Sequence, residues 1–171
     1  SESMSKSKKN VIDPENIIRD FGADSVRLFI LSDSPPEKDV QWSEEGIASS
    51  YKFIQKLWTL HLNIQNEIQK NHSKDKSGKI NKFTNQFIKK MTNNLNNFSY
   101  NVIVANLHEM YSFLLNEIKD EYTKETLLEN YKKILITIMP VIPHFSNECL
   151  DLINQREEFK WPKYDKTVLV E

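Results

Sequence analysis

A short polar segment near the start of the chain has the residue types that could close over a polyphosphate. Residues 4–10 read Met-Ser-Lys-Ser-Lys-Lys-Asn. Lys6 and Lys8 would each offer a compact, mobile positive charge to phosphate oxygens, including charge that builds up in a transition state. The hydroxyls of Ser5 and Ser7 can donate hydrogen bonds to the same oxygens. A solvated terminal tail has a similar composition, so residue types alone leave both interpretations open.

The segment is positioned by the helices that follow it. Asp13 and Pro14 read as an N-cap and a first-turn proline, and they predict a short helix that Gly22 ends. A second helix is expected from Asp24 to about Leu31, because the following Ser34-Pro35-Pro36 must break it. Arg27, on the otherwise apolar face of that helix, is expected to form an ion pair with a carboxylate such as Asp24.

Longer amphipathic segments occupy the middle of the chain. Ser43 is expected to cap a long helix whose inner face, at spacings of three and four, consists of Ile47, Tyr51, Ile54, Leu57, Trp58, Leu62 and Ile68. A polar connection is expected at 70–79 around Ser77-Gly78. Further helices are predicted over about 80–97, 100–118, 124–139 and 143–153, and the β-prone Thr167–Val170 predicts a short strand or docked extension.

These elements predict an all-α fold. It consists of an antiparallel helical bundle, preceded by a flexible loop and short helices and followed by a short extended tail. We divide the chain into the loop and short helices (1–42), the bundle (43–155) and an extended linker towards a missing C-terminal segment (156–171). Strand–helix–strand alternation, which a nucleotide-binding sheet would need, is not evident.

Composition limits the class of protein. The chain has 171 residues and a net charge of −1, which excludes a uniformly basic nucleic-acid binder, so any RNA contact must come from local patches. Its single cysteine, Cys149, excludes an internal disulfide and is expected to be a buried, inert thiol. No apolar run reaches the roughly 18 residues of a membrane span. We therefore expect a cytoplasmic protein with no membrane association.

Further motifs place the opening segment in a family. Residues 4–7 match the last four residues of the Lys-Met-Ser-Lys-Ser signature of class I aminoacyl-tRNA synthetases. The chain resembles leucyl-tRNA synthetases through Asn-Val-Ile-Asp-Pro at 10–14, Gly-Ala-Asp-Ser-Val-Arg-Leu at 22–28, Ser-Pro-Pro-Glu-Lys-Asp at 34–39 and Trp-Ser at 42–43. The Pro-Pro-Glu-Lys-Asp run followed by Trp-Ser separates it from the isoleucyl, valyl and methionyl relatives. Similarity continues through Pro143-His144-Phe145 and Glu148 to Trp161-Pro162 and Asp165. Two positions depart from the pattern: Ser3 stands in place of the first signature lysine, and Lys9 where many members carry glycine.

The resemblance implies a function that belongs to a longer protein. Leucyl-tRNA synthetases activate leucine with ATP and Mg²⁺ and transfer it to tRNA(Leu). Lys6 then becomes the candidate catalytic residue, stabilising the departing pyrophosphate, and Ser5, Lys6, Ser7 and Lys8 the candidate ATP ligands. The family's His-Ile-Gly-His signature is absent from this sequence. We therefore expect a C-terminal fragment that is inactive alone, with no cofactor bound, from a monomeric enzyme that meets ATP and leucine through its missing catalytic domain.

The bundle is implied to be the anticodon-binding-type domain, which packs against tRNA. Segment 70–90 holds seven lysines against one acid, Asp75, and this local charge suits phosphates. The candidate tRNA contacts are Lys70, Lys74, Lys76, Lys79, Lys82, Lys89 and Lys90, although a merely solvated turn has the same composition.

Two alternatives remain. The chain could be a noncatalytic helical interaction module, or the same region of a valyl, isoleucyl or methionyl synthetase. No metal site is expected, because His144 and Glu148, four apart on one helix, do not by themselves make one.

Overall fold

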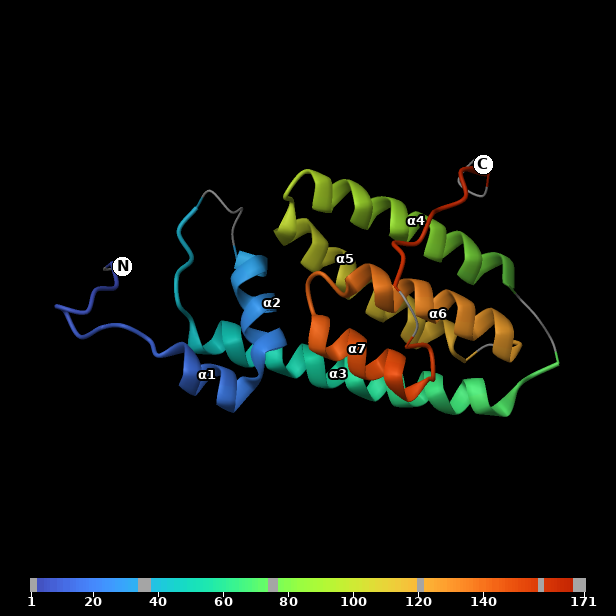
Figure 1. Cartoon of the computed structure of the whole chain (residues 1–171), viewed down its shortest axis with the longest axis horizontal. Coiled ribbons are helices and arrows are strands. Elements are labelled where there is room, and N and C mark those ends of the chain that lie inside the picture. Colours follow the sequence, from blue (N-terminus) through green and yellow to red (C-terminus); the bar gives the residue numbers. More distant parts are fainter. Residues whose placement is uncertain (1–2, 34–37, 74–76, 120–121, 157–158, 168–171) are drawn as a thin grey trace.

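A computed structural model describes residues 3–33, 38–73, 77–119, 122–156 and 159–167, and in these parts it contains helices and no strands. The helices are α1 (Pro14–Phe21), α2 (Ala23–Asp33), α3 (Glu44–Lys70), α4 (Ser77–Asn96), α5 (Tyr100–Glu117), α6 (Lys124–Ile138) and α7 (Pro143–Leu152). The predicted all-α fold is confirmed (Figure 1). None of these helices combines the length and apolar character that a membrane span requires.

Helices α3 to α6 form a four-helix bundle. Successive helices run in opposite directions along its long axis (Figure 1). α4 packs against α5 and α6, and α3 packs against the same two helices on the opposite side. The interior is dry and apolar: Ile64, Ile88, Leu107 and Ile134, one from each helix, are completely buried. Burial of these faces is what keeps the helices together, since isolated helices of this length are only marginally stable in water.

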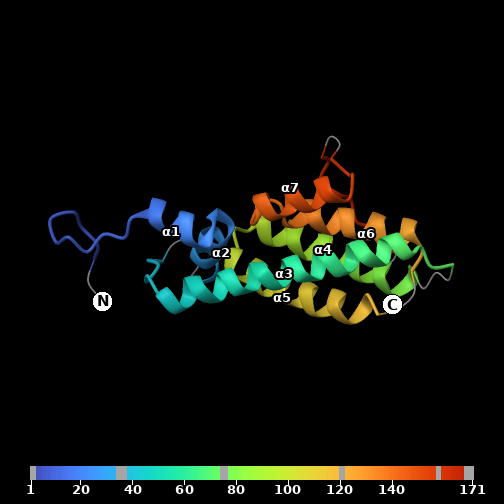
Figure 2. The same cartoon turned by 90° about the horizontal axis from the view of Figure 1, so that it is seen from below.

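The two short helices lie at one end of this bundle. Asp13 caps α1 as expected, with its side chain accepting a hydrogen bond from the Glu15 amide at 3.0 Å. Gly22 ends α1 with φ of 81°, a backbone conformation that side chains disfavour. The chain then turns into α2, which crosses the bundle end and contacts α3, α5 and α7 (Figure 2).

The crossing of α2 over α3 depends on Gly46. A Cβ atom at this position would lie 2.5 Å from Cε2 of Phe29, so only glycine allows α2 to approach this closely. Trp42 packs edge-on against the same Phe29 ring, with ring centroids 5.4 Å apart. The prediction that Trp42 is a packing residue at the junction between the short helices and the bundle is therefore confirmed.

The expected inner face of α3 was wrong in part. The predicted residues Trp58 and Leu62 are 36% and 43% exposed, whereas the helix buries Ile47, Ser50, Phe53, Leu57, Leu60, His61, Ile64 and Ile68. Both sets have helical spacing. Periodicity fixes how wide an apolar face is, but the positions of α5, α6 and α7 decide where it points.

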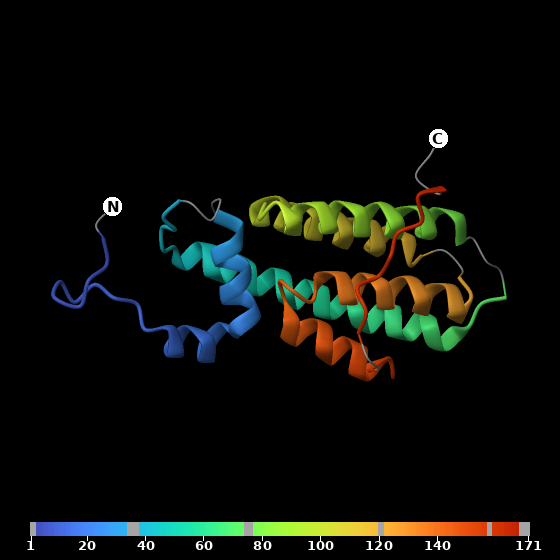
Figure 3. The ribbon, with the colours of Figure 1, turned by 45° about the horizontal axis from the view of Figure 1, so that its top comes forward.

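Two further boundaries differ from the prediction. Ser77 and Gly78 belong to the first turn of α4 and not to a connection. Residues 159–167 form no strand: Phe159 packs on the core, and the chain then crosses α6 and α4 on the surface (Figure 3). Val168–Val170, the rest of the predicted β-prone tail, and Ser34–Glu37, which include the predicted helix-breaking prolines, lie outside the described residues.

Candidate functional site

The segment ahead of α1 is an ordered turn. The amide of Lys8 donates to the Ser5 carbonyl, and the amide of Lys9 donates to the Lys6 carbonyl, both at 3.2 Å. The Asn10 side chain closes the turn, since its Oδ1 accepts from the Ser5 amide at 2.8 Å. The loop is therefore a defined structure held by its own backbone.

The side chains of the loop remain available. Lys6, Ser7 and Lys8 are exposed, Ser5 is half-buried, and the two serine hydroxyls lie 3.1 Å apart. The whole segment projects from the end of the molecule, away from the bundle (Figure 1). The structure thus brings the four predicted ATP ligands together on one surface loop.

Lys9 explains one departure from the family pattern. Its φ of 53° lies in the left-handed region, where glycine is least strained. The turn therefore retains the conformation that a glycine would favour, although a lysine occupies the position.

A buried carboxylate joins α2 to the distant helix α7. Asp24 is 6% exposed, and its two oxygens accept from the amides of Phe145 at 2.6 Å and His144 at 3.3 Å. These are first-turn amides, which have no partner within their own helix. The N-cap residue of α7 is Ile142, which has no side chain able to cap, so Asp24 supplies the missing acceptor and a favourable charge at the helix N-terminus.

Arg27, one turn further along α2, binds the same region. Its Nη2 donates to the Pro140 carbonyl at 2.7 Å and its Nε to the Val141 carbonyl at 3.0 Å, in the turn between α6 and α7. The expected ion pair with Asp24 was wrong. Both side chains instead bind the backbone of this turn, which only the tertiary fold brings close. We call this pair of residues the clamp.

The clamp gives the loop a fixed base. It joins residues more than 110 positions apart in the chain, and it connects the helix pair that follows the loop to the turn between two bundle helices. The Gly-Ala-Asp motif contained one of these residues, but the motif gave no indication of its partner.

Beside the clamp lies an open groove of about 740 Å³ between α2, α3 and α7. It is lined by Trp58, His144 and Glu148 among others, which explains why Trp58 is partly exposed. The described residues contain no group of three or more histidine, cysteine, aspartate or glutamate side chains that could hold a metal ion.

The predicted basic segment is partly neutralised by the fold. Lys70 pairs with Glu67 at 2.7 Å, and Lys90 pairs with both oxygens of Glu109, at 2.8 and 2.9 Å. These acids lie outside segment 70–90, so a count along the sequence could not include them. The tertiary structure therefore lowers the local charge that the sequence suggests.

Lys79 has a structural partner as well. Its ammonium lies 2.5 Å from an oxygen of Glu117, a carboxylate only 2% exposed that also accepts a hydrogen bond from Tyr122. Lys82 is half-buried and engaged in further interactions, while Lys89 is exposed with no partner in the part of the chain that the structure describes. Lys74 and Lys76 lie outside that part.

Two buried titratable groups have structural roles. Burial raises the pKa of the Cys149 thiol to about 12, so the prediction of an inert cysteine is confirmed. Burial also lowers the pKa of His61 to about 4, and its Nδ1 lies 2.9 Å from the Tyr131 hydroxyl inside the bundle. Neither group contacts the loop.

Comparison with known families assigns a class to this arrangement. The model for class I tRNA synthetases (I, L, M and V) matches residues 2–43, which include the loop and the clamp. The model described as the anticodon-binding domain of tRNA ligase matches residues 77–171. The chain therefore belongs to the anticodon-binding domain family of tRNA ligases. Because both parts match, a chance likeness of the loop alone is excluded.

The similar proteins are more specific. A leucine–tRNA ligase of Bartonella tribocorum is 35% identical over 184 residues, covering 99% of this chain and 20% of its own length. Those of Prochlorococcus marinus (33%) and Orientia tsutsugamushi (38%) have the same coverage. The chain thus spans about a fifth of the length of these relatives.

A solved structure shares the fold. The ternary complex of an Agrobacterium radiobacter K84 LeuRS with tRNA and LeuAMS superposes with a TM-score of 0.85 and 21% identity, covering 98% of this chain and 23% of that one.

Proposed function

We propose that this chain is the segment of a leucine–tRNA ligase that supplies the loop closing over ATP and a helical surface that docks tRNA(Leu). The observation that carries the proposal is an exposed Ser–Lys loop whose base is clamped to a bundle of the anticodon-binding family. The complete enzyme would activate leucine with ATP and Mg²⁺ and then charge tRNA(Leu), as a cytoplasmic monomer. The segment alone would be inactive, because a leucine pocket needs other parts of the enzyme.

Lys6 would carry the chemistry of the loop. Its ammonium is exposed on a turn whose backbone bonds are already satisfied, so the side chain can reach phosphates without unfolding the loop. A positive charge that meets the pyrophosphate as it leaves stabilises the transition state more than bound ATP. Ser5, Ser7 and Lys8 would contact the same phosphates as hydrogen-bond donors.

The test is Lys6→Ala in the complete enzyme, with Lys9→Gly as the matched control. Both variants remove one cation from the same loop, and Lys9→Gly keeps the left-handed turn. Lys6→Ala should lower the rate of adenylate formation about 100-fold while ATP affinity changes little. The control should retain most activity. Equal losses of ATP affinity and turnover in Lys6→Ala would refute the catalytic role.

Leucine is favoured over the sister amino acids by the names of the relatives, since the class I model itself covers the I, L, M and V enzymes. Charging assays of the complete enzyme with leucine, isoleucine, valine and methionine test this choice. Charging with any of the other three at the leucine rate would contradict it.

The proposed tRNA contacts include the lysines of segment 70–90, of which Lys89 is the most available. Binding to the phosphate backbone should depend on salt. Titration of the chain with labelled tRNA at 50 and 200 mM salt tests this part of the proposal directly.

A further inference from the structure

Residues 159–167 form a surface strap that runs antiparallel to α4. The Trp161 indole N–H donates to the Thr92 hydroxyl at 3.0 Å, and the Asp165 amide donates to Oδ1 of Asn85 at 2.7 Å. Asn85 and Thr92 are seven residues apart on a helix, or about 10.5 Å. Four extended residues, from 161 to 165, span about 13 Å, which matches this separation. Both ends of the strap are therefore fixed to one face of α4 (Figure 3).

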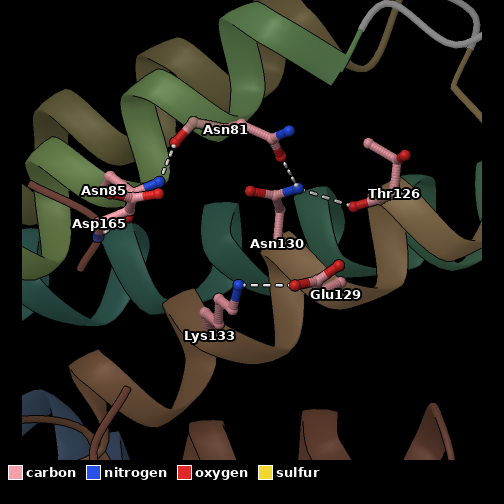
Figure 4. A network of polar contacts seen from close by, with 7 residues as sticks. All are labelled: Asn81, Asn85, Thr126, Glu129, Asn130, Lys133 and Asp165. Carbon is pink, nitrogen blue, oxygen red and sulfur yellow. Dashed lines mark hydrogen bonds and ion pairs between the residues drawn. The ribbon is translucent and has the colours of Figure 1, made fainter. Parts of the chain in front are cut away.

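A polar network extends this attachment to α6. Figure 4 shows Asn85 donating to the Asn81 carbonyl, and the Asn130 amide donating to Oδ1 of Asn81 and to the Thr126 carbonyl. These bonds measure 2.8–2.9 Å. The strap thus lies on a surface whose side chains are already ordered.

The strap carries a row of cations. Lys160, Lys163 and Lys166 are spaced three residues apart and all are exposed, with no hydrogen-bond or ion-pair partner among the described residues. An extended chain places them about 10 Å from one another. Lys89 lies four residues after Asn85 and three before Thr92, so it adds a fourth cation on the face of α4 that the strap follows.

Little negative charge opposes this row. The sequence of α4, residues 77–96, has no acidic residue. The acid of the strap, Asp165, binds the Thr167 side chain and amide at 2.7 and 2.8 Å, and these bonds lower its pKa. On α6, Glu129 is paired with Lys133 at 2.7 Å. Trp161, held by its indole N–H, remains 39% exposed between the lysines.

We propose that the strap patch, formed by Lys89, Lys160, Lys163 and Lys166 with Trp161, is a docking surface for the phosphate backbone of tRNA. This inference rests on the proposed function for its ligand. It assigns the contact to the tail and α4 together, although segment 70–90 was the predicted basic site. Unpaired cations on an ordered surface complement a polyanion, and an exposed indole face offers a ribose or base a stacking surface.

The experiment compares two triple variants of the 171-residue chain. The strap variant is Lys160→Gln with Lys163→Gln and Lys166→Gln. The control variant changes Lys38, Lys52 and Lys56 to glutamine; these lysines are also exposed and unpaired among the described residues. Both lose the same charge, so a general electrostatic effect would alter them equally. Binding to labelled tRNA is followed by fluorescence anisotropy between 50 and 200 mM salt.

Loss of three phosphate contacts should lower the slope of log K against log salt by about 2.7 for duplex RNA behaving as B-DNA does, or by about 2 for single strands. The first value means that the wild-type affinity falls about 40-fold more than that of the strap variant over this salt range. The control should retain the wild-type slope. Addition of tRNA should also protect the three strap lysines from acylation by an N-hydroxysuccinimide ester.

The outcomes separate the two proposals. Wild-type binding that survives in the strap variant, or equal losses in both variants, overturns the strap assignment and leaves the proposed function standing. If the unmodified chain fails to bind tRNA even at 50 mM salt, the docking part of the proposed function fails, and the strap assignment fails with it.

Discussion

Replacement of Asp24 by alanine should destabilise the chain by detaching α7 from α2. The carboxylate is 6% exposed and accepts from two first-turn amides of α7, at 2.6 and 3.3 Å. In the alanine variant these amides would lose their acceptor in a place that water reaches poorly. No side chain of α7 can replace it, because the N-cap residue is Ile142.

The magnitude follows from the two kinds of interaction lost. A hydrogen bond to a charged group contributes about 1.5–3 kcal/mol, and loss of a helix cap costs about 1 kcal/mol. These terms overlap, so we expect a loss of about 2–3 kcal/mol in the free energy of unfolding. For a chain of this length the melting temperature should fall by about 5–10 °C. Asp24→Asn, which keeps one acceptor oxygen, should lose about half as much.

Urea-induced unfolding followed by circular dichroism measures this difference. Asp20→Ala is the matched control, because Asp20 is an exposed carboxylate on α1 that pairs only with its neighbour Arg19 at 3.0 Å. The control should remain within about 0.5 kcal/mol of wild type. Hydrogen exchange at the His144 and Phe145 amides should accelerate in Asp24→Ala. A wild-type unfolding midpoint for that variant would refute the capping role.

Two other buried groups lead to further predictions. Since the pKa of His61 is about 4 in the fold and about 6.5 unfolded, the unfolded chain binds the extra proton, so stability should fall by about 2 kcal/mol between pH 7 and pH 5. His61→Asn, which keeps a polar atom near the Tyr131 hydroxyl, should lose most of this pH dependence in urea unfolding. Lys79→Met should cost about 1–2 kcal/mol because Glu117 loses its counter-charge, although the exposed lysine end moderates the cost. Adding Glu117→Gln to that variant should recover part of the loss, and failure to do so would contradict the pairing.

The sequence predicted the helices well because their signals are local. Asp13, Gly22 and Ser43 act through their own backbone and their immediate neighbours, so the ends of α1 and the start of α3 were correct. The loop was also identifiable, because its residue types are contiguous. The family resemblance of these motifs was then confirmed by the match to class I tRNA synthetases.

Long-range partners were not predictable in this way. The carboxylates that pair with Lys79 and Lys90 lie outside the basic segment, so a count along the sequence overstated its charge. The buried face of α3 was misplaced for the same reason, because helical period does not say which neighbour will cover which side.

The sequence by itself determined where helices start and stop and which residues form the polyphosphate-type loop, because caps, prolines and short motifs act over a few residues. Only the tertiary structure decided what Asp24 and Arg27 bind, and that the lysines of the tail lie beside Lys89 on α4. Those contacts join residues 69 to 121 positions apart. They form only once the bundle has buried its apolar faces and fixed the distances between its helices.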